Sequence, residues 1–527
     1  MTTGLSPAAC ADHTAIASFD WMAHHAQRAP AQLAVHDLGT GRRYTYQDLD
    51  RRAGSLAGWL RLQGLSRGDR VALLAPNGVH NFELQAACSR LSAILVPLNW
   101  RLSVPELGFI LSDAQPTLLV FHQAMAGSAE ALMSLHAGMG ALCITEQADD
   151  PYEAAAAEAD RVEACPPGAR LADVCTILYT SGTTGLPKGA LITHQMTLFN
   201  ALNLGIPALV GPRTVHLNVL PLFHTGGLNC YCNPALHAGG TVLLMRQFDP
   251  AETLQAISDS TLGVTHFFGV PANYLFMAQH AHFATADLSR LVNAGVGGAP
   301  ISISLLDTWA QRGVALQQGF GMTETGPSVL LLDRQDMRRK PGACGKVLLY
   351  AQARVVDAGG REVAVDEVGE LQVRGPSITP GYWRQEVLTR ESFVDGWFRT
   401  GDAARRDDEG FHYIVERWKD MYITGGENVY PAEVENVLSE LPGIGEVAVV
   451  GIADPKWGEV GCAVAVIQSG SMLGAADLIA HCRSRLARYK VPGKVVFVSQ
   501  LPRGATGKVL KRQLRADLGL PDPFARS

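Results

Sequence analysis

Residues 179–194, YTSGTTGLPKGALITH, gather side chains and backbone that bind anions. The preceding apolar run, 174–179, predicts a buried strand, and segment 181–189, rich in Gly, Ser and Thr, predicts a loop. Glycines let backbone N–H groups close around an anion, hydroxyl groups add donors, and Lys188 adds positive charge. The P-loop pattern places Gly before the lysine and Ser or Thr after it, whereas Lys188 stands between Pro and Gly. The residues therefore predict a phosphate-binding loop of another kind, although such a loop alone is also typical of a solvent-exposed turn.

Other stretches place titratable residues between apolar segments. Each has a plain structural explanation by itself: Glu324 in the first turn of a helix, Asp402 in a turn, His224 in an apolar core, Lys508 on a solvated basic face. The stretches are PLFHTGG (221–227), GVGGAP (295–300), GFGMTET (319–325), FRTGD (398–402), ERWKDMYITGGENVYPAEVE (416–435) and LPRGATGKVLKR (501–512).

Together with YTSGTTGLPKG, these stretches resemble in content and order the signature of the adenylate-forming superfamily. That superfamily includes acyl-CoA synthetases, adenylation domains of non-ribosomal peptide synthetases and beetle luciferases. The resemblance covers essentially the whole chain. It implies an enzyme that uses ATP, Mg²⁺ and coenzyme A to convert a carboxylic acid into an acyl-adenylate and then a thioester, with AMP and diphosphate as products.

The resemblance also implies which residues bind nucleotide, metal and coenzyme A. Thr183, Thr184 and Lys188 match the loop over the β- and γ-phosphates, and Thr183 with Glu324 matches the Mg²⁺ site. Among the residues that the resemblance assigns to nucleotide or coenzyme A binding, Phe320 would stack on adenine and Thr323 would contact the α-phosphate. Asp402 would accept from the ribose hydroxyls, and Arg417 would close over the nucleotide. That set comprises Thr180, Ser181, Gly182, Thr184, Gly185, Lys188, Gly298, Ala299, Pro300, Gly319, Phe320, Gly321, Met322, Thr323, Asp402, Arg417, Gly425, Gly426 and Glu427.

Catalytic roles follow from the same resemblance. Lys508 matches the lysine that bridges the substrate carboxylate and the α-phosphate, where negative charge gathers in the transition state. His224 matches a position lining the acyl channel, next to Phe223 and Thr225, which we expect in the acyl pocket. The expected catalytic set is Lys508, Thr183, Glu324 and His224.

Two half-reactions on one site predict a mobile C-terminal domain. Lys508 is needed for the first and should leave before the thiol attacks, so rotation about a hinge is expected. Lys419 matches the family's hinge position, and segment 424–428 would then line the pantetheine tunnel. We therefore predict a 1–418 adenylation domain and a 419–527 C-terminal domain.

The substrate tail is predicted to be uncharged. Residues 214–245 contain no Asp, Glu, Lys or Arg, and a second carboxylate buried there would need a partner. The motif spellings are most similar to those of ligases for aryl, phenylpropenoate and medium- to long-chain fatty acids, with a slight preference for an aromatic acid. The alternative is a stand-alone enzyme that loads an acyl carrier protein. Luciferase-type oxidative use of the adenylate is a further, less favoured alternative. A non-catalytic nucleotide sensor would lack a catalytic group, whereas Lys508, Glu324 and Asp402 are all present.

Apolar periodicity predicts the elements that position these residues. Leu49, Ala53, Leu56 and Leu60 have helical spacing, and short buried runs recur at 71–75, 93–99, 117–121, 241–245 and 264–271. This alternation predicts parallel sheets covered by helices. Short strands and turns are expected from about residue 373, then a βαβ-like tail. The predicted fold is α/β: stacked α/β subdomains plus a β-rich subdomain in the large N-terminal domain, and a small α+β C-terminal domain.

The amino-acid composition limits the classes of function that the chain can have. The chain has 527 residues, 47% hydrophobic, with a formal net charge of -6, so no basic surface for nucleic acid is expected. The uncharged stretch 214–245 contains too many Gly and Pro for a spanning helix and predicts buried strands, turns and a pocket wall. Ten irregularly spaced Cys and an N-terminus without a basic, then apolar, leader favour a cytoplasmic protein with reduced thiols. A homodimer is common in the family that the chain resembles.

Overall fold

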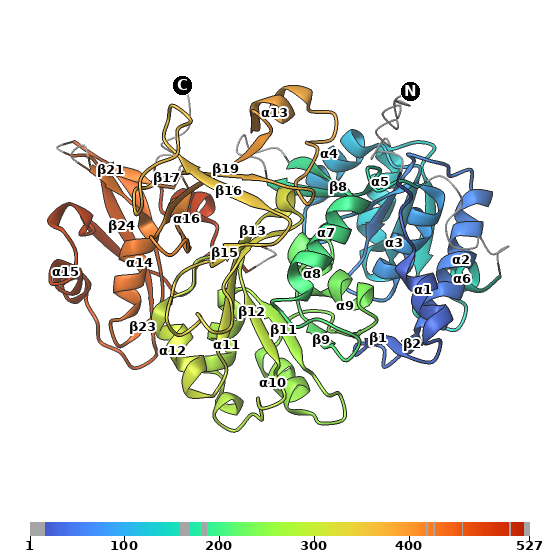
Figure 1. Ribbon diagram of the computed structural model, residues 1–527, viewed down its shortest axis with the longest axis horizontal. Helices are drawn as coiled ribbons and strands as arrows, with labels where there is room; N and C mark the ends of the chain where they lie inside the picture. Colours follow the sequence, from blue (N-terminus) through green and yellow to red (C-terminus); the bar gives the residue numbers. More distant parts are fainter. Residues whose placement is uncertain are drawn as a thin grey trace, which may run out of the picture.

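The computed structural model describes residues 16–158, 169–181, 187–417, 420–424, 427–455, 457–504 and 507–520. Figure 1 shows an elongated molecule with the first sheet and its helices (blue) at one end and the C-terminal elements (orange and red) at the other. The described residues form four β-sheets, two mainly parallel and two mainly antiparallel. The predicted α/β class with a smaller C-terminal unit is confirmed.

The first sheet has the order β6-β5-β3-β4-β7-β8 and is parallel except for the last pair. Its neighbouring helix α2 begins after Thr45, which forms a capping box with Asp48. The predicted apolar face of α2 is fully buried against this half of the molecule. The strands are β3 (Arg70–Leu74), β4 (Ile94–Pro97), β5 (Leu118–His122), β6 (Gly140–Ile144), β7 (Val174–Ser181) and β8 (Pro187–Thr193).

The second sheet has the order β15-β14-β13-β12-β11-β9-β10-β1-β2, with parallel strands from β13 to β1. The prediction of strands and turns throughout 214–245 is wrong for its middle, which is helical from Thr225 to His237. A helix buried on every side shows no polar face, so periodicity could not reveal it. The strands are β1 (Leu33–Asp37), β2 (Arg43–Thr45), β9 (Val215–Asn218), β10 (Thr241–Leu244), β11 (His266–Gly269), β12 (Asn293–Val296), β13 (Leu316–Gly321), β14 (Ser328–Leu331) and β15 (Lys346–Val347).

The third sheet is antiparallel and begins with β16, earlier than the predicted change of texture near residue 373. Apolar residues of β16 and β17 pack into one core with those of β19, so the short-strand region includes them. The strands are β16 (Gln352–Val356), β17 (Gly369–Arg374), β18 (Phe393–Val394), β19 (Trp397–Arg406) and β20 (His412–Arg417).

The fourth sheet belongs to the C-terminal part of the chain and has the order β22-β21-β24-β23, with β25 parallel to β24. The β24–α15–β25 unit is the predicted βαβ-like tail, and β23–β24 is a long hairpin. The strands are β21 (Tyr422–Thr424), β22 (Glu427–Val429), β23 (Ile444–Asp454), β24 (Gly458–Ile467) and β25 (Lys494–Phe497). The change of sheet between β20 and β21 is compatible with the predicted boundary at 418/419, which stays a prediction.

Helices pack on these sheets. They are α1 (Trp21–Arg28), α2 (Tyr46–Leu62), α3 (His80–Leu91), α4 (Val104–Ala114), α5 (Ala126–Leu135), α6 (Pro151–Glu158), α7 (His194–Gly205), α8 (Thr225–Gly227), α9 (Asn233–His237), α10 (Pro250–Ser258), α11 (Pro271–Gln279), α12 (Ile303–Gln311), α13 (Glu386–Glu391), α14 (Pro431–Ser439), α15 (Ala475–Arg483) and α16 (Lys511–Asp517). Among the described residues, no helix is long and apolar enough to cross a bilayer.

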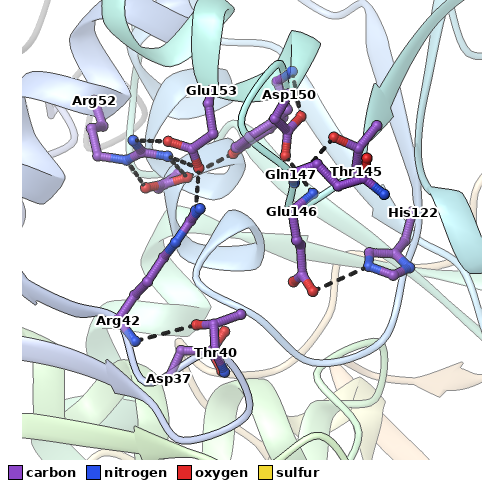
Figure 2. A network of polar contacts seen from close by, with 12 residues as sticks. Asp37, Thr40, Arg42, Arg52, His122, Thr145, Glu146, Gln147, Asp150 and Glu153 are labelled. Carbon is purple, nitrogen blue, oxygen red and sulfur yellow. Dashed lines mark hydrogen bonds and ion pairs between the residues drawn. The ribbon is translucent and has the colours of Figure 1, made fainter.

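A buried ion-pair network holds α2, α3 and α6 together. Arg52 contacts Glu83 and Glu153, with Nη1 2.8 Å from Glu153 Oε2, and Arg42 lies 3.0 Å from the same carboxylate. Figure 2 shows both guanidinium groups directed at Glu153. Tyr152 Oη donates to Glu83 Oε2 over 2.8 Å. A buried charge without a partner is strongly destabilising, so this network fixes how the three helices pack.

Buried histidines should make stability depend on pH. His216, only 1% exposed, lies in the second sheet, and burial lowers its pKa to about 3 from the usual 6.5. Between pH 3 and 6.5 the unfolded chain therefore binds a proton that the folded chain does not, so stability should rise with pH across this window and level off above it.

The test is urea unfolding of wild type and His216→Asn at pH 5, 6, 7 and 8. We expect the variant's free energy of unfolding to have a slope between pH 5 and 6 that is shallower by up to about 1.4 kcal/mol per pH unit, because one proton is removed from the linkage. Identical slopes would show that His216 is not the group responsible.

Candidate functional site

The predicted site residues gather where the second sheet's parallel strands end. The loop 297–300 follows β12, the turn 322–327 follows β13, and α8 follows the loop after β9. The β7–β8 hairpin of the first sheet supplies a further side, since its strand β8 contacts the 3₁₀ turn Thr323–Thr325. Carboxyl ends of parallel strands are where α/β sheets usually place their ligand sites.

The predicted phosphate loop is shorter than expected. Thr180 pairs with Lys188 and Ser181 with Pro187 across the hairpin, so Lys188 lies on β8 and the prediction that it belongs to the loop is wrong. Because the backbone of Lys188 is held in a strand, only its side chain can move to reach a ligand. Gly182, Thr183, Thr184 and Gly185 lie outside the described residues, as does the side chain of Ser181.

A compact polar cluster joins Lys188, Glu324 and Tyr382. Lys188 Nζ lies 3.2 Å from Glu324 Oε1 and donates to Tyr382 Oη over 2.6 Å. Tyr382 Oη in turn donates to Glu324 Oε1 over 2.8 Å. Burial and the Glu324 carboxylate raise the pKa of Tyr382, so its hydroxyl keeps its proton. Sequence reasoning missed Tyr382, because GYW carries no signal of a contact with a lysine 194 residues away.

The loop after β12 meets the C-terminal part of the chain. Gly298 has φ +83°, and a Cβ built on it would lie 3.4 Å from Lys508 Cε. Gly507 lies close to the end of β11, since a Cβ built on it would lie 2.9 Å from Val270 Cγ2. Lys508 therefore reaches the carboxyl ends of β11 and β12 from the C-terminal sheet's side. Ala299 and Pro300 continue the same loop.

His224 is buried near the start of α8, where the charge of Lys508 affects its pKa. It precedes α8, and its Nδ1 accepts from the Gly226 N–H over 3.0 Å, which leaves the ring proton on Nε2. Burial, and to a lesser extent the charge of Lys508, lower the pKa of His224 to about 3, so the ring is neutral near pH 7. A neutral imidazole next to an ammonium can donate or accept but adds no charge of its own.

The predicted acyl-pocket residues surround the start of α8. Phe223 is 9% exposed, and Thr225 is buried with its Oγ1 accepting from Asn229 over 3.3 Å. Gly295 on β12 and Gly297 in the loop after it pack close to an aromatic ring: Cβ atoms built on them would lie 3.0 and 3.6 Å from Phe268 ring carbons, and the one on Gly295 would lie 2.8 Å from Tyr231 Oη. The wall is therefore apolar and aromatic.

The remaining predicted nucleotide residues lie on β13, the turn after it, and β19. Phe320 is half-buried on β13 against the third sheet's core. Gly319 and Gly321 flank it, and a Cβ on Gly321 would lie 1.8 Å from Pro327 O, so no larger residue fits without rearrangement. Met322 and the buried Thr323 follow on the turn.

Asp402 is buried on β19, not in a turn, and its backbone pairs with Arg417 of β20. The predicted ribose and closing residues are thus opposite each other in one ladder. The side chains of Arg417 and Glu427 are not described, although both residues lie on strands. Lys419, Gly425 and Gly426 lie outside the described residues.

Comparisons with known proteins match both parts of the chain. A family model described as AMP-binding enzyme matches residues 22–383, more than half of the chain. A second, described as AMP-binding enzyme C-terminal domain, matches residues 433–508.

Similar proteins match along nearly their whole length. A feruloyl-CoA synthase from Amycolatopsis sp is 41% identical over 501 residues, which cover 95% of this chain and 98% of the relative. A long-chain-fatty-acid–CoA ligase from Mycobacterium tuberculosis (strain ATCC 25618 / H37Rv) is 36% identical over 499 residues, covering 94% and 97%. Among solved structures, ATP-bound MatB from Rhodopseudomonas palustris superposes with a TM-score of 0.88 at 32% identity, covering 97% of this chain and all of that one.

Proposed function

Because the chain belongs to the family of AMP-binding, adenylate-forming enzymes and is an acyl-CoA ligase of that family, we propose that it joins a hydrophobic aromatic or medium- to long-chain fatty acid to coenzyme A. The acid's carboxylate attacks the α-phosphate of ATP, which gives acyl-AMP and diphosphate. The thiol then attacks the acyl carbon and expels AMP. Adenylation is required because a free carboxylate is a poor electrophile.

The observation that carries this proposal is the position of Lys508. Its side chain comes from the C-terminal part of the chain and lies against Gly298, and its charge contributes to the lowered pKa of His224, which is neutral near pH 7. A positive charge held there would stabilise the negative charge that gathers as carboxylate and α-phosphate approach. Because His224 is neutral, Lys508 does not have to compete with a second cation for that charge.

The nucleotide is proposed to lie across the turn after β13. Phe320 would stack on adenine, Thr323 would contact the α-phosphate, Asp402 and Arg417 would bind the ribose side, and Lys188 would bind the outer phosphates. Gly298 has φ +83°, a conformation that favours glycine, and the side chains of Lys508 and Val270 lie against it, so a ligand at this loop would lie close to both the main chain and Lys508.

Glu324 suits Mg²⁺. Magnesium usually takes one or two protein carboxylates and completes its shell with phosphate oxygens and water. The described residues contain no cluster of three metal-binding side chains, but a single carboxylate that is 2% exposed and faces a lysine on the phosphate hairpin is the donor that such a site needs. Bound Mg²⁺ would neutralise phosphate charge. Thr183, outside the described residues, is proposed as the second ligand.

The acid's tail is proposed to lie between α8 and the glycines at the end of β12, Gly295 and Gly297. Phe223, Thr225, Phe268 and Gly297 offer an apolar and aromatic wall without a charged partner for a second carboxylate. An aromatic acid fits these ring contacts best, and the similarity to a feruloyl-CoA synthase supports it.

The C-terminal domain, 419–527, is proposed to rotate about Lys419 between the half-reactions. Rotation would withdraw Lys508 and bring Gly425, Gly426 and Glu427 to the pantetheine tunnel. This division of labour is a prediction from the motif match, and the contact of Lys508 with the loop at Gly298 supports it, because the first half-reaction would need Lys508 near this loop.

The proposed activity is tested by mass spectrometry of the products formed from Mg-ATP and a pool of aromatic and aliphatic acids, with and without coenzyme A. We expect an acyl-CoA only when coenzyme A is present, with an aromatic acid preferred. Acyl-AMP accumulating equally in both reactions would instead indicate a carrier protein as acceptor, and no acyl-AMP in either would contradict the proposed function.

A further inference from the structure

Tyr382 touches both charged residues proposed to bind Mg-ATP. Its hydroxyl donates to Glu324 Oε1 over 2.8 Å and accepts from Lys188 Nζ over 2.6 Å. Its ring also lies beneath the ammonium, with Nζ 4.0 Å from the ring centroid. One side chain therefore contacts the cation through an oxygen and a π face, and the carboxylate through a proton.

The backbone holds Tyr382 firmly at this point. Its segment pairs with β8 on the side away from β7: Ala190 and Tyr382 form a bridge, and the Trp383 N–H donates to Gly189 O over 2.8 Å. The Tyr382 N–H donates to Thr389 Oγ1 over 2.9 Å. Tyr382 is thus attached to the same strand that carries Lys188.

The same segment also holds the turn that carries Glu324. The Thr379 N–H donates to the Glu324 main-chain oxygen over 2.8 Å, and Thr379 Oγ1 donates to Leu191 O of β8 over 2.7 Å. Residues 379–383 therefore connect the phosphate hairpin to the turn after β13. Tyr382 lies where these two attachments meet, so its hydroxyl position is set by both.

Direct pairing of Lys188 with Glu324 has a consequence for ligand binding. To bind phosphate and Mg²⁺, the Lys188 ammonium and the Glu324 carboxylate would have to turn away from each other. The buried Glu324 carboxylate would then lose its cationic partner, which is destabilising. The Tyr382 hydroxyl remains a neutral partner for Glu324 Oε1 throughout and leaves Oε2 available. Its ring remains a weak partner for the ammonium, which a phosphate can outcompete.

We propose that Tyr382 is a positioning residue for Mg-ATP: it fixes the Glu324 carboxylate through Oε1 and holds Lys188 at the hairpin so that both groups can bind the nucleotide complex. The inference rests on the proposed function, because it takes Glu324 and Lys188 as the residues that bind metal and phosphate. Tyr382 itself is not expected to touch the reacting atoms.

The test is Tyr382→Phe, which keeps the ring and removes only the hydroxyl. Binding of ATP is measured by isothermal titration calorimetry without acid or coenzyme A, with Mg²⁺ and with EDTA. Loss of a hydrogen bond to a charged group predicts a Kd for Mg-ATP that is higher by about 10- to 100-fold, and a smaller change in EDTA. In steady state, KM for Mg-ATP should rise, while KM for the acid stays the same.

The matched control is Tyr152→Phe. Tyr152 Oη also donates over 2.8 Å to a buried glutamate, Glu83, that pairs with a cation, but in the network that joins α2, α3 and α6. Equal Kd changes in both variants, or an unchanged Kd in Tyr382→Phe, would overturn the inference. Wild type that binds no ATP would overturn the proposed function itself.

A double-mutant cycle provides a second, independent test of the role of Tyr382. If Tyr382 acts through Glu324, then Tyr382→Phe should change the Mg-ATP Kd much less in a Glu324→Gln background than in wild type. Additive changes would show that Tyr382 acts on folding or elsewhere, and would also overturn the inference. Thermal unfolding of each variant identifies any loss that comes from misfolding.

Discussion

Replacing Lys508 by alanine is expected to lower the rate of acyl-adenylate formation by at least about 100-fold and to leave thioester formation from supplied acyl-AMP within a few fold of wild type. The Lys508 side chain lies against Gly298, where carboxylate and α-phosphate are proposed to meet. Its removal would leave the transition-state charge without that cation, whereas the second half-reaction is proposed not to require it. ATP–diphosphate exchange measures the first half-reaction, and quenched-flow product analysis the second.

Lys494→Ala is the control, because Lys494 is an exposed lysine on β25 of the same sheet. It should leave both half-reactions unchanged. Equal losses of both half-reactions in Lys508→Ala would contradict the division of labour, and an unaffected exchange rate would contradict the role of Lys508 altogether.

Glu324→Gln is expected to lower adenylation by about 100-fold or more and to raise the Mg²⁺ concentration needed for half-maximal rate. The substitution keeps the shape of a side chain that is 2% exposed but removes its charge. Lys188, 3.2 Å from Glu324 Oε1, then loses its anionic partner, and a hard cation loses its carboxylate ligand. The measurement is ATP–diphosphate exchange over a range of Mg²⁺ concentrations.

Glu153→Gln is the comparison for this variant. Glu153 also pairs with cations, Arg42 and Arg52, but in the helix network of the N-terminal part (Figure 2). It should change stability without changing the Mg²⁺ dependence. A Glu324→Gln enzyme with a wild-type Mg²⁺ dependence would remove Glu324 from the proposed metal site.

Much of the fold could be predicted because it depends on local pattern. The helical spacing from Leu49 to Leu60 and the short apolar runs gave strands and helices at the right places, since burial on one face imposes period 3.6 or a continuous apolar run. The prediction of strands and turns is wrong for segment 225–237, because a helix enclosed by other elements lacks the polar face that reveals a helical period of 3.6 residues.

Lys188 shows the limit at the site. Its residue type indicated an anion site, but its position on β8 depends on the pairing of Thr180 with Lys188, which a Gly-rich stretch does not reveal. The order of the motifs along the chain likewise indicated the family and the expected reacting groups, but it could not indicate the distances between those groups.

The sequence by itself predicted the kind of chemistry: a Gly-rich segment with a lysine for phosphate, a carboxylate for Mg²⁺, a C-terminal lysine and an uncharged stretch for the acid. Only the tertiary structure decided which of these meet. Tyr382 joins Lys188 across 194 residues and Glu324 across 58, and Lys508 reaches Gly298 from the C-terminal part of the chain. Such contacts arise from strand order and from the packing of separate sheets, and therefore leave no periodic or local trace in the sequence.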